Sequence, residues 1–292
     1  MSDSWRDSEG QVVGGQFQLV KHLGGSDHSV VFLTQRGKDK SEKAAIKFIQ
    51  ADAANADAQL ARWKQTAQLS HPNLIKLFES GRCQLAGLDL LYVVMEYAQE
   101  NLAEFLPQRA LTADETRDML APFVDTLSHL HGKCFAHGRI KPANILAIDD
   151  QLKLSSDSVC RQGELQIGAG KPDDYVAPEA ASGKTSSAGD VWSLGLTLIA
   201  ALTQQIPDET NEGAPKIPDS VPQPFFDIAR NSLRRDFKAR WTVADISNRL
   251  NPVAVAASVP AAVPAAAASI SAAVAVAEPP KTSSANSGVS SS

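Results

Sequence analysis

One short stretch of this sequence brings several polar and charged side chains onto a single loop. It begins at His137, passes through Arg139 and Lys141, and ends at Asn144, where the apolar run 145–148 follows directly. Arg139 is permanently cationic, so it can hold a phosphate-like anion but cannot accept a proton. Arg139 therefore suits the binding of an anion and cannot serve as a general base.

The stretch resembles the catalytic loop of eukaryotic-type protein kinases, whose pattern reads H-R-D-L-K-x-x-N. The spacing from His137 to Asn144 fits this pattern without a gap, but Arg139 stands where the family has a proton-accepting Asp. The resemblance implies that Lys141 reaches the γ-phosphate of ATP, that Asn144 serves a metal ion, and that His137 is structural.

Two short apolar runs near the start of the chain predict a hairpin. Residues 17–20 and 29–34 flank a glycine-bearing turn, so we expect two strands joined at that turn. The family places a glycine-rich lid over the ATP phosphates here. Gly24 then matches the first lid glycine and Val31 the valine that covers adenine, while serines replace the second and third glycines.

A lysine-bearing strand and a helix are expected next. Residues 44–48 alternate around Lys47, which resembles the lysine that contacts the α- and β-phosphates, and Ala45 would help to sandwich adenine. Residues 51–69 have a helical composition. Arg62 occupies the position at which the family has the Glu that pairs with this lysine, and the sequence from 51 to 78 contains no Glu.

The apolar run 90–98 predicts a buried strand that leads into a polar step. It resembles the fifth strand and hinge of the family. Met95 then corresponds to the gatekeeper, and Glu96 to Ala98 would offer backbone groups to adenine.

The metal-binding Asp of the family has no direct equivalent here. After a short strand at 151–154, Ser156 falls at the position of that Asp, and a slip of one residue would recruit Asp157 instead. A neutral hydroxyl is a poor ligand for magnesium, so both readings stay open.

Further landmarks belong to the scaffold of the family. A capping box at Thr112 begins an amphipathic helix up to residue 131. Glu179 matches the A-P-E signature, Asp190 the D-x-W-S-L-G helix start, and Arg240 the expected partner of Glu179. The Pro- and Gly-rich span 204–222 suggests that the substrate-docking helix of the family is short or absent.

Composition excludes several classes of protein. A net charge of −5 leaves no basic field for nucleic acid, and 43% hydrophobic residues suffice for a sizeable core. Cys83, Cys134 and Cys160 lie far apart, which fits a reducing cytoplasm better than a disulfide framework or a zinc site. The polar start of the chain has no signal-peptide pattern, so we expect a cytoplasmic protein.

The end of the chain differs in composition from the rest. Residues 252–277 are almost entirely Ala and Val and carry no charge, but Pro260 and Pro264 interrupt them. A membrane-spanning helix needs about twenty strongly apolar residues, so the prolines favour a disordered Pro/Ala linker or tail. For residues 1–250 no membrane contact is expected.

The motifs follow one another in the order of the family. The resemblance implies an α+β, two-lobed protein kinase fold, with an antiparallel sheet and one helix in the N-lobe and a mainly helical C-lobe. The expected division is an N-terminal extension at 1–15, a kinase-like domain at 16–250 whose lobes meet near residue 97, and the linker or tail at 251–292.

The substitutions favour a pseudokinase, a regulatory or scaffolding module that acts on a protein partner and binds ATP weakly or without metal. ATP is a possible cofactor and magnesium a doubtful one. The alternatives are an active serine/threonine kinase that uses Asp157 for the metal, and transfer of the nucleotide part of ATP. Arg139 either replaces part of the metal charge at the phosphates, or points to solvent or pairs with an acid such as Asp157.

Overall fold

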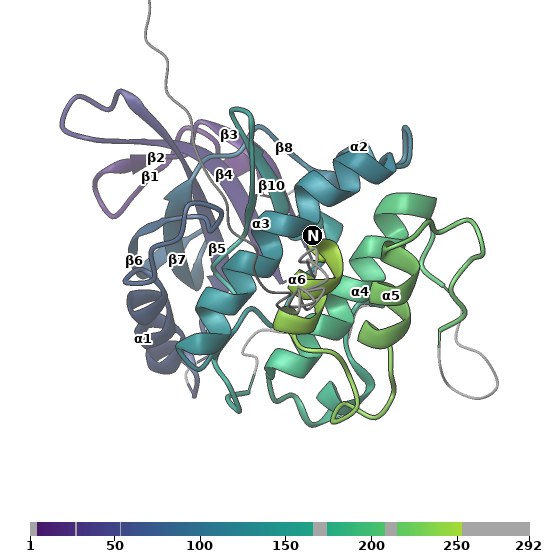
Figure 1. Cartoon of the computed structure of the whole chain (residues 1–292). Helices are drawn as coiled ribbons and strands as arrows, with labels where there is room; N and C mark the ends of the chain where they lie inside the picture. Colours follow the sequence, from purple (N-terminus) through teal and green to yellow (C-terminus); the bar gives the residue numbers. More distant parts are fainter. Residues whose placement is uncertain (1–4, 27, 53, 166–173, 208–214, 253–292) are drawn as a thin grey trace, which may run out of the picture. The chain divides into compact units, whose positions relative to one another are not determined.

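The computed structural model describes residues 5–26, 28–52, 54–165, 174–207 and 215–252 (Figure 1). Residues up to Val253 form one compact unit. Nearly all of the predicted tail lies outside the described residues. So does 166–173, which is part of the span 159–174 that the kinase resemblance predicts to be the activation segment.

A five-stranded antiparallel sheet forms the first part of the compact unit. In spatial order the strands are β3 (Lys21–Ser26), β4 (Ser29–Arg36), β5 (Glu42–Gln50), β7 (Leu88–Glu96) and β6 (Leu77–Leu85). Side chains alternate between its faces, so β4, β5, β6 and β7 each contribute to two separate apolar clusters, whereas β3 contributes Leu23 to one of them.

Different elements cover the two faces of this sheet. Helix α1 (Ala56–Thr66) packs its buried Trp63 with one cluster. The small hairpin of β1 (Val12–Val13) and β2 (Phe17–Gln18) packs with the other, so residues expected to be an extension contribute to the core.

The predicted hairpin between 17–20 and 29–34 is wrong in its first strand. Residues Phe17–Gln18 pair with β1, and the strand that pairs with β4 is β3, which contains both glycines. The turn lies between Ser26 and Ser29 because Gly24 and Gly25 adopt extended positions within β3.

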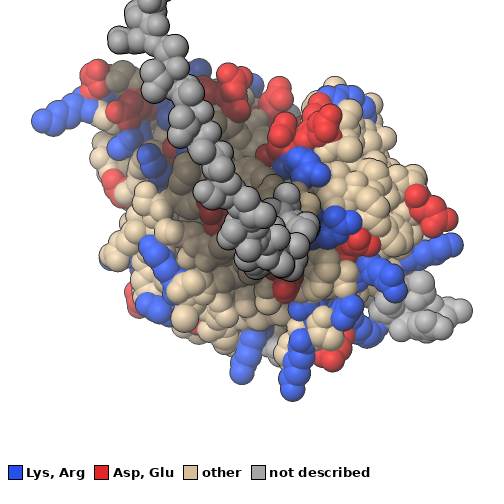
Figure 2. Space-filling model, in the orientation of Figure 1, with Lys and Arg blue, Asp and Glu red and all other residues tan. Residues whose placement is uncertain are grey.

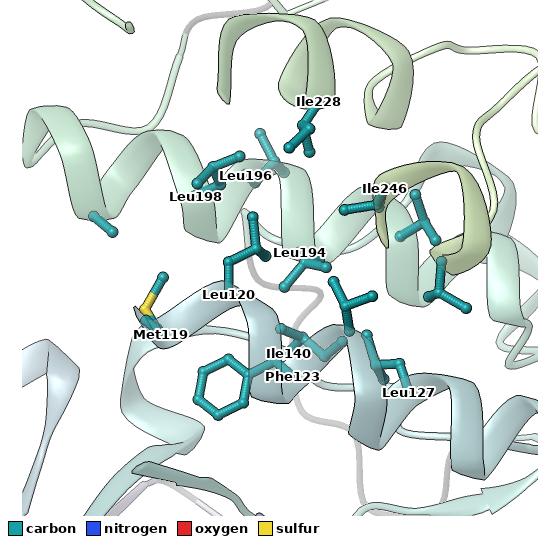
Figure 3. Close-up of a cluster of buried hydrophobic side chains, with 14 of the residues drawn as sticks. Met119, Leu120, Phe123, Leu127, Ile140, Leu194, Leu196, Leu198, Ile228 and Ile246 are labelled. Carbon is teal, nitrogen blue, oxygen red and sulfur yellow. The ribbon is translucent and has the colours of Figure 1, made fainter. Parts of the chain in front are cut away.

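The helical part is built around α3 (Ala113–Gly132) and α4 (Ser187–Thr203). Thr112 closes a capping box with Glu115, as predicted. Figure 3 shows side chains of α3 facing those of α4, with Ile228 and Ile246 closing the cluster. These last two residues belong to α5 (Phe225–Ser232) and α6 (Val243–Leu250).

The described part of the span 204–222, which excludes 208–214, contains no helix, so no substrate-docking helix is seen in it.

Short elements join the sheet to the helices. The short elements are β8 (Glu100–Asn101), α2 (Leu102–Phe105), β9 (Phe135–Ala136), a 3-10 helix (Pro142–Asn144), β10 (Ile145–Ile148), β11 (Gln151–Leu154), β12 (Cys160–Arg161) and a second 3-10 helix (Pro178–Ser182).

The arrangement confirms the expected α+β, two-lobed kinase fold, with sheet and α1 in one lobe and mainly helices in the other. Across the described ranges, no helix has both the length and the apolar character needed to cross a bilayer.

Candidate functional site

A buried carboxylate holds the start of the loop from His137 to Asn144 in place. Asp190, in the first turn of α4, accepts hydrogen bonds from the backbone N–H groups of His137 (2.8 Å) and Gly138 (2.7 Å). The ring of His131 bonds the same carboxylate at 2.9 Å. Gly138 has φ of +76°, a conformation that favours glycine, so the loop geometry depends on this residue type.

His137 links the loop to the segment that follows β11. Its ring is fully buried; Nε2 donates to the carbonyl of Ser155 at 2.7 Å, and Nδ1 accepts from the N–H of Arg139 at 3.3 Å. Burial lowers the pKa of His137, so the imidazole is neutral and its tautomer is set by these two bonds. His137 therefore holds the loop in place, in keeping with a structural role.

Arg139 and Asn144 face each other across the turn of the loop. The Asn144 side chain donates from Nδ2 to the carbonyl of Arg139 at 2.6 Å. Arg139 is half-buried, and within the described residues its guanidinium makes no hydrogen bond or ion pair. Lys141 lies between them, also half-buried. A permanent cation thus stands on an otherwise ordered loop.

Lys47 has a carboxylate partner that does not come from α1. Its Nζ lies 2.6 Å from Oδ2 of Asp157, and the two side chains are 23% and 14% exposed. Burial by itself would raise the pKa of Asp157. The charge of Lys47 and its hydrogen bond outweigh that effect, so the pKa lies below the ordinary value. The pairing of Arg139 with Asp157 considered above is therefore not formed.

Ser156 points away from this ion pair. Its side chain is fully buried, and Oγ donates to the carbonyl of Ile75 at 2.6 Å. The hydroxyl at the position of the family's metal-binding Asp is therefore engaged in holding two backbone segments together.

The donors near Lys47 do not fit a magnesium ion well. The carboxylate beside Lys47 is that of Asp157, and Lys47 already neutralises its charge. Asn144, expected to serve a metal ion, is hydrogen-bonded through Nδ2 to the carbonyl of Arg139. Magnesium prefers an octahedral set of oxygens that includes one or two free carboxylates. Over the part of the chain that the structure describes, no group of three or more His, Cys, Asp or Glu side chains could hold a metal ion. While it pairs with Lys47, the Asp157 carboxylate is not free to serve as a magnesium ligand.

Helix α1 is fastened to the segment after β11 by polar contacts that sequence reasoning missed. Trp63 Nε1 donates to the carbonyl of Asp157 at 2.9 Å, and Thr66 Oγ1 donates to that of Val159 at 3.2 Å. Arg62, at the position of the missing Glu, lies 3.0 Å from the carboxylate of Glu164. At this helix position the family has a negatively charged Glu whose partner is a Lys. Here the helix residue is the cation Arg62, and its partner is the acid Glu164.

The residues expected to enclose adenine lie together. Register pairs Val31 with Lys47 and Ala45 with Met95, which puts all four on the sheet face that α1 covers. The N–H of Ala98, in the step after β7, has no acceptor among the described residues. Apolar side chains together with an unused backbone donor are the groups that an adenine ring would contact.

The Glu96 side chain has a structural task. Lys153 Nζ lies 3.0 Å from both carboxylate oxygens, and the N–H of Lys76 donates to one of them at 2.9 Å. The backbone N–H of Glu96 is also engaged, since it donates to the carbonyl of Lys76 at 3.1 Å.

Two serines are hydrogen-bonded to each other at the tip of the lid hairpin. Oγ of Ser26 and Oγ of Ser29 lie 3.0 Å apart at the tip of the β3–β4 hairpin. A Cβ on Gly25 would lie 2.3 Å from the carbonyl oxygen of Ser29, so the hairpin itself requires that glycine. Gly24 has φ of +138° with open space beside it, and so remains the lid glycine that can approach a phosphate.

Glu179 and Arg240 are joined by a bidentate ion pair in the C-lobe. The two N···O distances are 2.6 and 3.1 Å, and the Arg240 side chain is completely buried. This pair fixes the end of the activation segment to the helical lobe.

Comparison with known proteins agrees with this geometry. A family model for the protein kinase domain matches residues 17–250, which is most of the chain. The chain belongs to the protein kinase domain family. The probable serine/threonine-protein kinase PknB of Lactococcus lactis is 24% identical to it, over 86% of this chain and 43% of the relative. The serine/threonine-protein kinase PrkC of Bacillus subtilis is 28% identical, over 68% and 32%.

CBL-interacting protein kinase 4 of Oryza sativa is also 28% identical, over 82% of this chain and 53% of its own length. The chain thus spans about half or less of the length of these curated relatives. The identities are low, so the match establishes a protein kinase domain with serine/threonine kinase relatives. Whether the domain is active has to be argued from the residues of the site.

Proposed function

We propose that this kinase domain is a pseudokinase: it binds adenine nucleotide without needing magnesium, transfers no phosphoryl group and regulates or scaffolds a protein partner. The observation that carries the proposal is Arg139. It occupies the general-base position on a loop that is otherwise fully ordered by His137, Asn144 and Asp190. The cytoplasmic setting expected from the sequence belongs to the same proposal.

Without an Asp at position 139, the loop lacks the general base of the family, and His137 cannot replace it. A guanidinium cannot accept the proton of a substrate hydroxyl, and a general base typically contributes about 10²–10⁴ in rate. His137 is buried and bonded at both ring nitrogens, so it cannot replace the base. The ordered loop also supports the proposal, since it keeps Arg139 at that position.

The same site retains what is needed to hold a nucleotide. The apolar side chains of Val31, Ala45 and Met95 would contact adenine, with the N–H of Ala98 as donor. Lys47 would contact the phosphates, in competition with Asp157. The guanidinium of Arg139, which has no partner among the described residues, would supply positive charge that a metal ion provides in active kinases.

A second candidate is an active serine/threonine kinase, and one observation favours it. The carboxylate of Asp157 contacts Lys47, so a one-residue slip does bring an acid to the phosphate-binding lysine. If Asp157 bound magnesium, phosphoryl transfer would have to rely on the positioning of ATP and the substrate hydroxyl, without a general base. Labelled phosphate that reaches a protein acceptor from ATP, and that disappears in Lys47→Ala, would support this candidate.

Thermal unfolding of the full chain separates the two. A ligand that binds only the folded state raises the unfolding temperature by an amount that grows with its concentration over Kd. Our proposal predicts a rise with ATP that persists in EDTA and is lost in Lys47→Ala. A rise that requires magnesium would favour the active kinase. No rise at millimolar ATP would contradict nucleotide binding and leave a scaffold.

A further inference from the structure

The helical lobe carries a groove of its own. It has a volume of about 500 Å³ and lies among α2, the first half of α3 and the β10–β11 hairpin. None of its lining residues belongs to the nucleotide site described above, so it offers a separate place for a ligand.

The floor of the groove is apolar. Leu102 and Met119 are buried at its base, and Phe105, Leu111 and Leu152 are half-buried around them. Half-buried apolar side chains in a concave surface gain burial when a partner's apolar side chain enters. The floor therefore suits one or two aliphatic side chains.

The rim of the groove carries only negative charge. Glu100, Asp118 and Asp150 are exposed and line it, and within the described residues none of the three has a hydrogen bond or ion pair. A fourth acid, Glu115, is already neutralised by Arg109 at 2.6 Å. No Lys, Arg or His lines the groove. In Figure 2, acidic side chains gather in the upper part of the view, over the region where Figure 1 shows β8 and α2.

A backbone acceptor adds to this negative rim. Pro122 lies inside α3 and has no N–H, so the carbonyl of Asp118 cannot receive its usual i→i−4 hydrogen bond. Both residues line the groove. A donor from outside the chain can satisfy this carbonyl, as the N–H groups of Lys and Arg do.

We propose that this groove is a docking site for a segment of a partner protein in which one or two Leu or Ile side chains lie beside Lys or Arg. The aliphatic side chains enter the floor, and the cations pair with Asp118, Asp150 and Glu100. Three unpaired carboxylates around an apolar floor complement that pattern and repel an acidic one. The docking site is independent of whether the nucleotide site binds ATP.

The test uses the full chain and a set of labelled ten-residue peptides. Each peptide carries two Leu residues beside three Lys or Arg. One control set has Glu in place of the cations, and another has Ser in place of Leu. Binding is measured by fluorescence polarisation for the wild type, for Asp118→Asn/Asp150→Asn, and for the matched variant Asp7→Asn/Asp219→Asn. The matched variant removes two exposed aspartates elsewhere.

Basic apolar peptides should bind, and both control sets should bind more weakly. An exposed ion pair contributes roughly a factor of 1.5 to 5, so loss of two predicts binding weaker by about two- to 25-fold in Asp118→Asn/Asp150→Asn. The matched variant should bind as the wild type does. Added salt should weaken binding to the wild type, because it screens exposed charges.

Three results would overturn the proposal. The first is no binding of any basic apolar peptide at millimolar protein concentration. The second is equal loss in the two double variants, which would reflect net charge alone. The third is self-association of the wild type, seen by sedimentation, that is abolished by Asp118→Asn/Asp150→Asn, because the groove would then hold a second copy of this chain.

Discussion

Replacing Asp157 by Asn should make the domain less stable and, in the absence of metal, a better binder of ATP. The variant keeps the shape of the side chain and removes the negative charge that contacts Lys47 at 2.6 Å. Losing one partner of a fully buried ion pair costs about 3–5 kcal/mol. Here the side chains are 23% and 14% exposed, and Asn can still accept a hydrogen bond, so solvent screening lowers the expected loss to about 1–3 kcal/mol.

The assay is unfolding in urea and by heat. For a domain of this size about 1 kcal/mol corresponds to 2–4 °C, so the unfolding temperature should fall by about 2–12 °C. The folded-state pKa of Asp157 lies below the ordinary 3.8, so the stabilisation is present above that pH and is lost as the pH falls toward the folded pKa. Asp157→Asn should remove this part of the acid dependence.

The affinity for ATP in EDTA should move in the opposite direction. In the wild type the phosphates compete with Asp157 for Lys47, and the Asp157 charge repels them. Asp157→Asn removes both effects. If instead the wild type bound ATP only with magnesium and Asp157→Asn abolished that binding, Asp157 would be a metal ligand and this reasoning would be refuted.

Three further predictions concern contacts that hold the domain together. Arg240→Ala should lower the free energy of unfolding by about 3–5 kcal/mol in urea, and Arg240→Lys should recover little, since Lys cannot form the buried bidentate pair with Glu179. Thr112→Ala should cost about 1 kcal/mol through loss of the α3 cap, with an unchanged far-UV spectrum. A double-mutant cycle of Arg62→Ala and Glu164→Ala should give a coupling of only about 0.2–1 kcal/mol, because Glu164 is 37% exposed; a value near zero would remove this pair from the account.

Local spacing was enough to predict much of this structure. The capping box at Thr112 marked the start of α3, and the alternation around Lys47 marked β5, because both signals lie within one element. The boundaries of β11 also agree with the strand predicted at 151–154. Such features depend on residues that are near one another in the chain.

Pairings across the fold could not be predicted in the same way. Asp157 meets Lys47 across 110 positions, and Arg62 meets Glu164 across more than a hundred. Which acid approaches which cation depends on the path of the chain after β11, and a local pattern does not encode that path. The first strand of the lid was misplaced for a related reason: a short run does not show which neighbouring strand it pairs with, and Phe17 and Gln18 pair with β1.

Transfer of the γ-phosphate from labelled ATP tests the central proposal most directly. The full chain is incubated with magnesium and a mixture of protein acceptors, beside Lys47→Ala as the background. A pseudokinase should give the same signal as the variant, because Arg139 cannot act as the base. Transfer by the wild type that is absent in Lys47→Ala would show that the domain is an active kinase.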